Sequence, residues 1–145
     1  MFEPTFADVP NTNLKEITHD WEFEVGGRTV PVPAFVRFDG SSIPGFAQPI
    51  IGKPYDKKYE VPAFKHDYCF LTHCCTFVEA NNLFYKDLRD NKVNIFKAMA
   101  KYTAVSTVGY YHWCKKDVKG LKELRALLDA RPDAGYYKLF IGRKI

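Results

Sequence analysis

The sequence has no long uninterrupted run of apolar residues. Its most hydrophobic segment, residues 93–113, is interrupted by Lys97 and Lys101, whereas a membrane-spanning helix needs roughly 18 apolar residues in succession. The N-terminus, MFEPTFADVPN, contains acidic residues and prolines but neither a basic start nor an apolar stretch. We therefore expect no signal peptide, no transmembrane segment and a chain that stays in the cytoplasm in which it is made.

Charge of one sign does not dominate either. Lysine and arginine number 21 and aspartate and glutamate 17, which leaves a formal net charge of +4, and the basic residues are scattered along the chain. A nucleic-acid-binding protein typically gathers its basic residues on one face and carries a recognisable motif. Because the sequence shows neither pattern, we expect a solvated surface and no nucleic-acid partner.

Cysteine is scarce as well, with four residues and no CxxC pair. In a chain without a signal peptide, we expect Cys69, Cys74, Cys75 and Cys114 to be free thiols that behave as small buried apolar residues. Cys74 and Cys75 are adjacent, so on a helix they would point to different faces.

Aromatic residues, by contrast, make up 16% of the chain, within an apolar share of 46% that is ordinary for a globular protein. A length of 145 residues suits one domain with a hydrophobic core. We therefore expect a single domain over 1–145. Its expected parts are an irregular arm over 1–14, a β-hairpin and a long ordered loop over 15–61, a helical body over 62–130, and a tail over 131–145 that forms a short strand or packs its aromatic residues.

The hairpin is predicted by the segment DWEFEVGGRTVPVP. Gly26 and Gly27 supply the positive φ angles of a two-residue turn between two β-rich runs. Pro31 and Pro33 restrict the second run to a sheet edge.

The helical body is predicted by a change to helical periodicity after residue 61. Pro62 suits a first helical turn, Asp117 is a plausible N-cap, and Pro132 follows the end of the last helix. Four helices are expected. The first starts at Pro62, and the others span 77–90, 92–113 (with a bend near Gly109) and 117–129. The last helix has a buried stripe of Val118, Leu121, Leu124 and Leu128. The fold class is therefore α+β and mainly helical: an N-terminal β-hairpin and a long ordered loop packed on a three- to four-helix body.

The pair His66-Asp67, in VPAFKHDYCFLTHCC, is the sharpest chemical feature. Consecutive helix residues diverge by about 100°, so the two side chains cannot pair with one another. They can serve one site in different roles, with His66 as general base and Asp67 as ligand to a divalent cation. The structural alternative stays open: Asp67 would favour the helix dipole and His66 would hydrogen-bond locally.

A catalytic histidine also needs a neighbour that orients the imidazole, and a cation needs further oxygen ligands. The orienter candidates on the next helix are Glu79, Asn81, Asn82 and Asp87. The turn FDGSS, with Asp39, Gly40, Ser41 and Ser42, is the candidate loop near the site. In this arrangement Asp67 and Asp39 would bind Ca²⁺.

Two other arrangements are also compatible with the residues. His66, Cys69 and His73 are spaced i, i+3, i+7 and could share Zn²⁺ with Cys114 or His112, although structural zinc sites usually draw on two clustered pairs of ligands. Ser42, His66 and an acid would form a nucleophilic triad, but no strand–turn–helix nucleophile elbow surrounds Ser42. An Asp-Gly turn that ties down the loop is the commoner explanation of DGSSIP.

Four segments resemble, in order, a family of small uncharacterised proteins encoded by phages and prophages. These segments, between residues 28 and 113, are VPVPAFVRFDGSSIPGF, AFKHDYCFLTHC, VEANNLFYKDLRD and YTAVSTVGYYHW. They are similar to the family motifs VPAGF…DGASIP, HDYLY, EAD..F and Y.AV…G…W. The matching positions are Asp39, Gly40, Ser42, Pro44, His66, Asp67, Tyr68, Glu79, Ala80, Tyr102, Gly109 and Trp113.

Two positions depart from that pattern. The glycine before the phenylalanine of the first motif is missing, and Asn81 stands where the family tends to have aspartate. An amide cannot supply negative charge to a cation or an imidazolium, although it can orient His66 by hydrogen bonding.

The resemblance implies a non-catalytic phage-encoded accessory protein, which is either a virion or tail component or a binder of a host factor. Its partners would be phage structural proteins or a host protein, and its location the bacterial host cytoplasm or the virion. The network of His66, Asp67 and DGSSIP would then be structural.

The alternative is a small hydrolase of lipid esters or cell-wall components. The His-Asp helix also resembles the core of phospholipase A2 enzymes, where the histidine activates water and the aspartate binds calcium. This chain lacks that family's half-cystine framework and calcium loop. In this alternative His66 is the base, Asn81 or Glu79 the orienter, and Asp67 with residues 38–43 the cation site.

Overall fold

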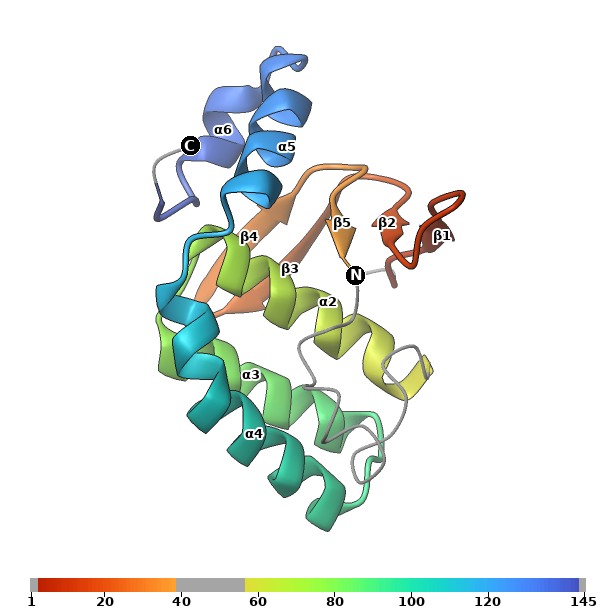
Figure 1. Ribbon diagram of the computed structural model, residues 1–145, viewed down its shortest axis with the longest axis vertical. Coiled ribbons are helices and arrows are strands. Elements are labelled where there is room, and N and C mark those ends of the chain that lie inside the picture. Colours follow the sequence, from red (N-terminus) through yellow and green to blue (C-terminus); the bar gives the residue numbers. More distant parts are fainter. Residues whose placement is uncertain (1–2, 39–56, 144–145) are drawn as a thin grey trace.

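The computed structural model describes residues 3–38 and 57–143, which form short strands followed by helices (Figure 1). The mainly helical α+β class predicted from the sequence is confirmed. The strands are β1 (Phe6–Asp8), β2 (Lys15–Ile17), β3 (Trp21–Val25), β4 (Arg28–Val32) and β5 (Arg37–Phe38). The helices are α2 (Lys57–Thr72), α3 (Phe77–Asp90), α4 (Ile95–Cys114), α5 (Val118–Asp129) and α6 (Ala134–Lys138).

The strands pair in two small antiparallel groups. β1, β2 and β5 form one sheet in that order, and β3 and β4 form a hairpin. The predicted turn is confirmed, because Gly26 and Gly27 both have positive φ, of 58° and 73°. Within the described residues β4 pairs with β3 alone, so Pro31 lies on an edge strand as expected. The arm over 1–14 is not wholly irregular, since its central residues form β1 against β2.

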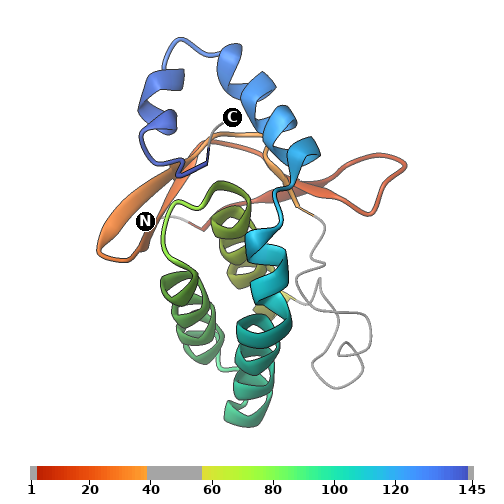
Figure 2. The same cartoon turned by 60° about the vertical axis from the view of Figure 1, so that its left-hand side comes forward.

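Helix α2 lies between the strands and the α3–α4 pair (Figures 1 and 2). Phe64 is fully buried at the centre of the face that meets the strands. Its ring lies 5.0 Å from that of Phe38 and 5.1 Å from that of Phe6, between centroids, and Tyr68 follows one helical turn later on the same face. Aromatic side chains thus join β1, β5 and α2 in one core.

The helix boundaries follow their capping residues in most cases. Thr76 accepts a hydrogen bond from the Glu79 backbone N–H and donates its own backbone N–H to the Glu79 carboxylate, so a capping box starts α3. Asp117 caps α5 as predicted. Leu121, Leu124 and Leu128 form the buried stripe of α5.

Two predictions about the helices were wrong. α2 includes Lys57, so Pro62 lies in its second turn rather than its first. The stability gained by burying this helix on two sides outweighs the loss of the one backbone hydrogen bond that proline removes. Val118 is 53% exposed because it is the first residue of α5, before the helix meets the core. The tail packs the aromatic residues Tyr137 and Phe140 against the core, which is one of its two expected outcomes, and it forms the short helix α6 rather than a strand.

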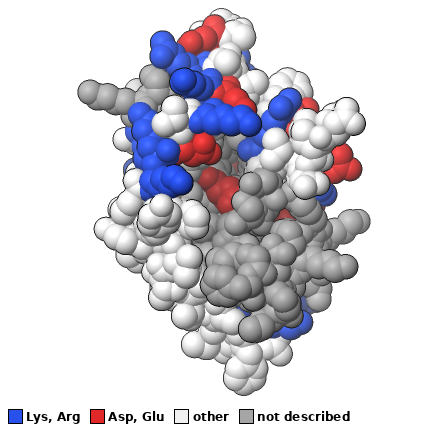
Figure 3. Space-filling view, in the orientation of Figure 1, with Lys and Arg blue, Asp and Glu red and all other residues white. Residues whose placement is uncertain are grey.

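Charge is unevenly distributed over the molecule. On the face shown in Figure 3, acidic and basic side chains gather in the upper half, over α5 and the strands, and the region over α4 is largely uncharged. No helix within residues 3–38 and 57–143 has the length and apolarity needed to cross a membrane.

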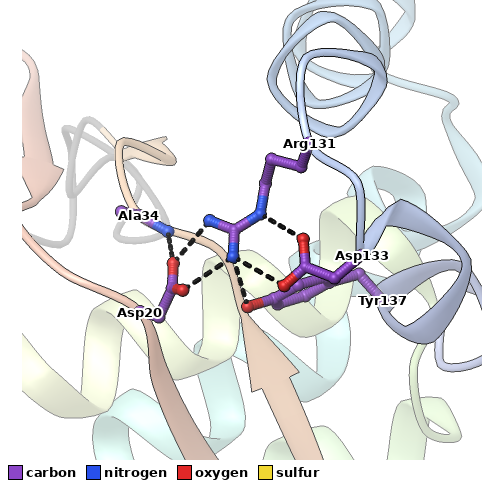
Figure 4. Close-up of polar contacts among 5 residues, drawn as sticks. All are labelled: Asp20, Ala34, Arg131, Asp133 and Tyr137. Atoms are coloured by element: carbon purple, nitrogen blue, oxygen red, sulfur yellow. Dashed lines mark hydrogen bonds and ion pairs between the residues drawn. The ribbon is translucent and has the colours of Figure 1, made fainter.

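Arg131 joins the α5–α6 segment to the strands through hydrogen bonds (Figure 4). The guanidinium of Arg131 donates two hydrogen bonds of 2.7 Å to the Asp20 carboxylate, before β3, and two more to Asp133. It also donates to the Tyr137 hydroxyl and lies over that ring. The hydrogen bonds from Arg131 hold the pKa of Asp20 below its usual value. Asp20 in turn accepts the backbone N–H of Ala34, so one carboxylate joins three segments.

We expect Arg131→Lys to destabilise the protein by about 1 kcal/mol, because an ammonium group cannot donate paired hydrogen bonds to the Asp20 and Asp133 carboxylates at the same time. Arg125→Lys is the matched control, since Arg125 makes an exposed i,i+4 pair with Asp129 of the kind that contributes little. Urea unfolding of the two variants measures the difference. Equal stability of both would contradict the assigned role of Arg131.

Candidate functional site around His66

His66 lies on the face of α2 that meets α3, and it is 3% exposed. Its ring is held between two aromatic rings, with centroids 4.1 Å from Phe70 and 4.9 Å from Phe84. Phe70 is four residues along the same helix, and such i,i+4 neighbours share one face. Phe84 comes from α3, so the imidazole orientation is set by the packing of the two helices.

Asn81 of α3 fixes the hydrogen-bonding state of this imidazole. The distance between His66 Nε2 and Asn81 Oδ1 is 2.9 Å, and Asn81 is 2% exposed. An amide oxygen only accepts hydrogen bonds, so Nε2 carries the proton and Nδ1 of the neutral ring carries a lone pair. Nδ1 is buried and has no hydrogen-bond partner in the described part of the chain. The arrangement is that of a base and its orienting residue.

Burial also determines the charge of His66. Loss of hydration lowers its pKa to about 4, against the opposing effect of the hydrogen bond to Asn81. The imidazole is therefore neutral near pH 7, with its Nδ1 lone pair available to accept a proton.

His66 and Asp67 both line a pocket of about 1130 Å³. Its walls come from α2, the second half of α4, α5 and the strands β2 and β5. Apolar wall residues include Phe70, Leu71, Val105 and Leu127, and charged ones include Arg37, Lys115, Lys116, Lys119 and Glu123. The pocket thus combines an apolar lining with basic and acidic groups.

The other orienter candidates are engaged elsewhere. Glu79 belongs to the capping box of α3 and lies 3.9 Å from Arg28. Asp87 forms an ion pair of 3.1 Å with Lys65, and burial raises its pKa despite that partner. Asn82 accepts a hydrogen bond from the Tyr102 hydroxyl. Asn81 is thus the candidate that contacts His66.

The predicted loop near the site lies outside the described residues. This applies to its four candidate residues, Asp39, Gly40, Ser41 and Ser42, and hence to the Asp39 part of the calcium site and to the Ser42 triad. Asp67 is half-buried in the pocket wall.

The zinc site predicted from His66, Cys69 and His73 was wrong. His73 comes just after the end of α2 and has a φ of 52°, so it leaves the helical face that the spacing assumed. Its ring stacks on Trp113, with centroids 3.8 Å apart, and His66 is bonded to Asn81. Cys69 lies instead beside Cys74, with 3.7 Å between the sulfur atoms.

The distant walls of the pocket were not predicted from the sequence. α5 follows α2 by some fifty residues, and no motif links Lys119 or Glu123 to His66. The aromatic surroundings of His66 could be predicted in part from the sequence, because Phe70 is four residues further along the same helix.

Comparison with known proteins places the chain among uncharacterised relatives. An "Uncharacterized protein y4jT" of Sinorhizobium fredii (strain NBRC 101917 / NGR234) is 37% identical over 105 residues, which are 72% of this chain and 31% of the relative. The chain thus spans about a third of the length of that relative. No solved structure matches the chain. Residues 15–105, which include β2 to β5, His66 and Asn81, match a family described as "Protein of unknown function (DUF1353)", and the chain belongs to this family.

Proposed function

We propose that the chain is a small hydrolase of ester bonds in which His66 is the general base. The observation that carries the proposal is the state of the imidazole: Asn81 holds Nε2–H, and Nδ1 is a buried lone pair without a described partner, on a residue that lines a large pocket. An unsatisfied buried polar atom costs about 1–3 kcal/mol, so its retention calls for an explanation. A neutral imidazole nitrogen with a free lone pair is a group that can accept a proton in general base catalysis.

The reaction needs only water as co-substrate. The Nδ1 lone pair of His66 takes a proton from water while the hydroxide oxygen forms a bond to the ester carbonyl carbon. The imidazolium then returns the proton to the departing alcohol oxygen as the ester bond breaks. Asp67, adjacent in the pocket wall, supplies the carboxylate that stabilises positive charge at the site or, as the sequence predicts, binds Ca²⁺.

The pocket lining favours a lipid ester over a cell-wall component. Phe70, Leu71 and Leu127 offer apolar surface to an acyl chain, and Lys115, Lys116 and Lys119 offer positive charge to an anionic headgroup. A polar glycan or peptide would leave the apolar walls without a partner.

A second function is favoured by a different surface. Phe96 is 79% exposed, and Met99, Tyr110 and Tyr111 on the same helix are more than half exposed. Large exposed aromatic side chains are typical of protein-binding surfaces. We therefore also propose the accessory role, in which α4 binds a phage structural protein or a host protein. Mass spectrometry of purified phage particles, which would contain or lack the chain, tests whether the protein is a component of the virion.

The hydrolase proposal predicts a graded loss of activity. We expect His66→Gln to reduce the hydrolysis of phospholipid vesicles by about 10²- to 10⁴-fold, since it removes the base. Asn81→Ala should reduce it by at least about tenfold, because the imidazole loses its fixed tautomer. Asn82→Ala, one residue further along α3, is the matched control and should keep full activity. Release of fatty acid, measured by mass spectrometry with and without a calcium chelator, checks the prediction.

Wild-type protein that releases no fatty acid from anionic or neutral phospholipids would contradict the lipid-ester proposal. Activity that survives in His66→Gln would contradict the role of His66 specifically. Loss of calcium dependence in Asp67→Asn, with helicity unchanged, would support Asp67 as a cation ligand.

The buried neutral state of His66 also predicts a pH-dependent stability. Its pKa is about 4 in the folded chain against 6.5 for the free group, so the unfolded chain binds more protons between these values. The free energy of unfolding should therefore fall as pH is lowered from about 6.5 to 4, by about 3 kcal/mol from this group. His66→Phe, which keeps the aromatic packing, should flatten this part of the curve. Urea unfolding across this pH range measures it, and the exposed His112→Gln should keep the wild-type slope.

A further inference from the structure

Three of the four cysteines meet at the turn between α2 and α3. Their sulfur atoms all lie within 4.8 Å of one another, although Cys69 is in α2 and Cys74 and Cys75 follow its end. The three residues are 0%, 4% and 7% exposed and form no disulfide. The sequence predicted free buried thiols but placed Cys74 and Cys75 on different faces of a helix. The chain leaves the helix before them, and both side chains turn back toward Cys69.

The backbone at this turn is held in place from two directions. His73, with its positive φ, still donates its backbone N–H to Cys69 at 2.8 Å, which closes the last turn of α2. The C-terminal segment adds a hydrogen bond of 2.8 Å from Gly142 N–H to the Thr72 carbonyl. The convergence of the three sulfur atoms therefore depends on a packed turn rather than on free side-chain rotation.

The spacing suits a shared metal ion better than a sulfur–sulfur bond. Cys69 Sγ and Cys74 Sγ are 3.7 Å apart, and a disulfide bond requires about 2.05 Å. A zinc–thiolate bond is about 2.3 Å, which places two sulfur ligands of a tetrahedral ion about 3.8 Å apart. The pair already stands at the separation that such an ion imposes.

The chemistry of the cluster also favours a cation. Three thiolates whose sulfur atoms lie within 4.8 Å of one another would place like charges together in a buried site. A bound metal ion removes this repulsion, and a thiolate is the form that binds metal.

We propose that Cys69, Cys74 and Cys75 form a three-thiolate site for one soft metal ion, Zn²⁺ or Cu⁺. Thiolates select these ions over calcium and magnesium. Within the described residues no fourth histidine, cysteine or carboxylate joins the group, so Zn²⁺ would take an outside ligand and Cu⁺ would be three-coordinate. The walls of the His66 pocket do not include these cysteines. The bound ion would tie the end of α2 to the start of α3, the two helices that carry His66 and Asn81.

The test uses the full chain, reduced and free of oxygen, titrated separately with Zn²⁺ and with Cu⁺ against a competing chromogenic chelator. We expect the chain to bind one ion of at least one of these metals. The metal that binds with the lower dissociation constant is then identified as the ion of this site. Cys69→Ser, Cys74→Ser and Cys75→Ser should each weaken binding at least tenfold. Cys114→Ser is the matched control, because Cys114 is an exposed thiol at the end of α4, and it should bind as the wild type does.

A second measurement uses only the wild-type chain, so its result does not depend on whether the variants fold. Alkylation of the native wild-type chain, followed by mass spectrometry, should show that the metal protects Cys69, Cys74 and Cys75 while Cys114 reacts at an unchanged rate. Binding of neither ion at one per chain would overturn the proposal. Equal protection of all four thiols, or binding that Cys114→Ser abolishes, would overturn it too.

Discussion

Burial of α2 on two sides is the constraint on which the other elements depend. One face carries Phe64 and Tyr68 into the strands, and the other carries His66 and Phe70 against α3. A helix in this position must satisfy every polar side chain that it buries. Lys65 meets this requirement through the Asp87 carboxylate and His66 through the Asn81 amide. α3 therefore supplies the polar partners that allow α2 to be central.

The two residues differ in how this requirement is met. The Lys65 ammonium has an oppositely charged partner in Asp87, 3.1 Å away. His66 keeps one nitrogen without a described partner and stays neutral because hydration is lost. A buried polar atom without a hydrogen-bond partner is expected at functional sites. His66 has such an atom and lies in the wall of the pocket.

The pocket itself depends on contacts far from His66. α5 forms one wall, and α5 is attached to the strands through Arg131 and its carboxylate partners. A bidentate guanidinium restrains both distance and angle, and together with the buried Leu124 and Leu128 it holds α5 against the rest of the fold. At the end of α2, the cysteine turn leads directly into the capping box that starts α3, the helix that carries Asn81.

Local chemistry alone determined several elements. The turn at Gly26-Gly27, the α3 helix and the Asp117 cap were predicted from the sequence, because each depends on residues within a few positions of one another. His66 and its neighbour Asn81 could be named as candidates for the same site from helix spacing. Tertiary packing decided the rest. It extended α2 upstream of Pro62, made the tail helical, separated His73 from Cys69 and brought three cysteines together. These outcomes depend on which distant surfaces bury one another, and residue spacing along the chain carries no information about that.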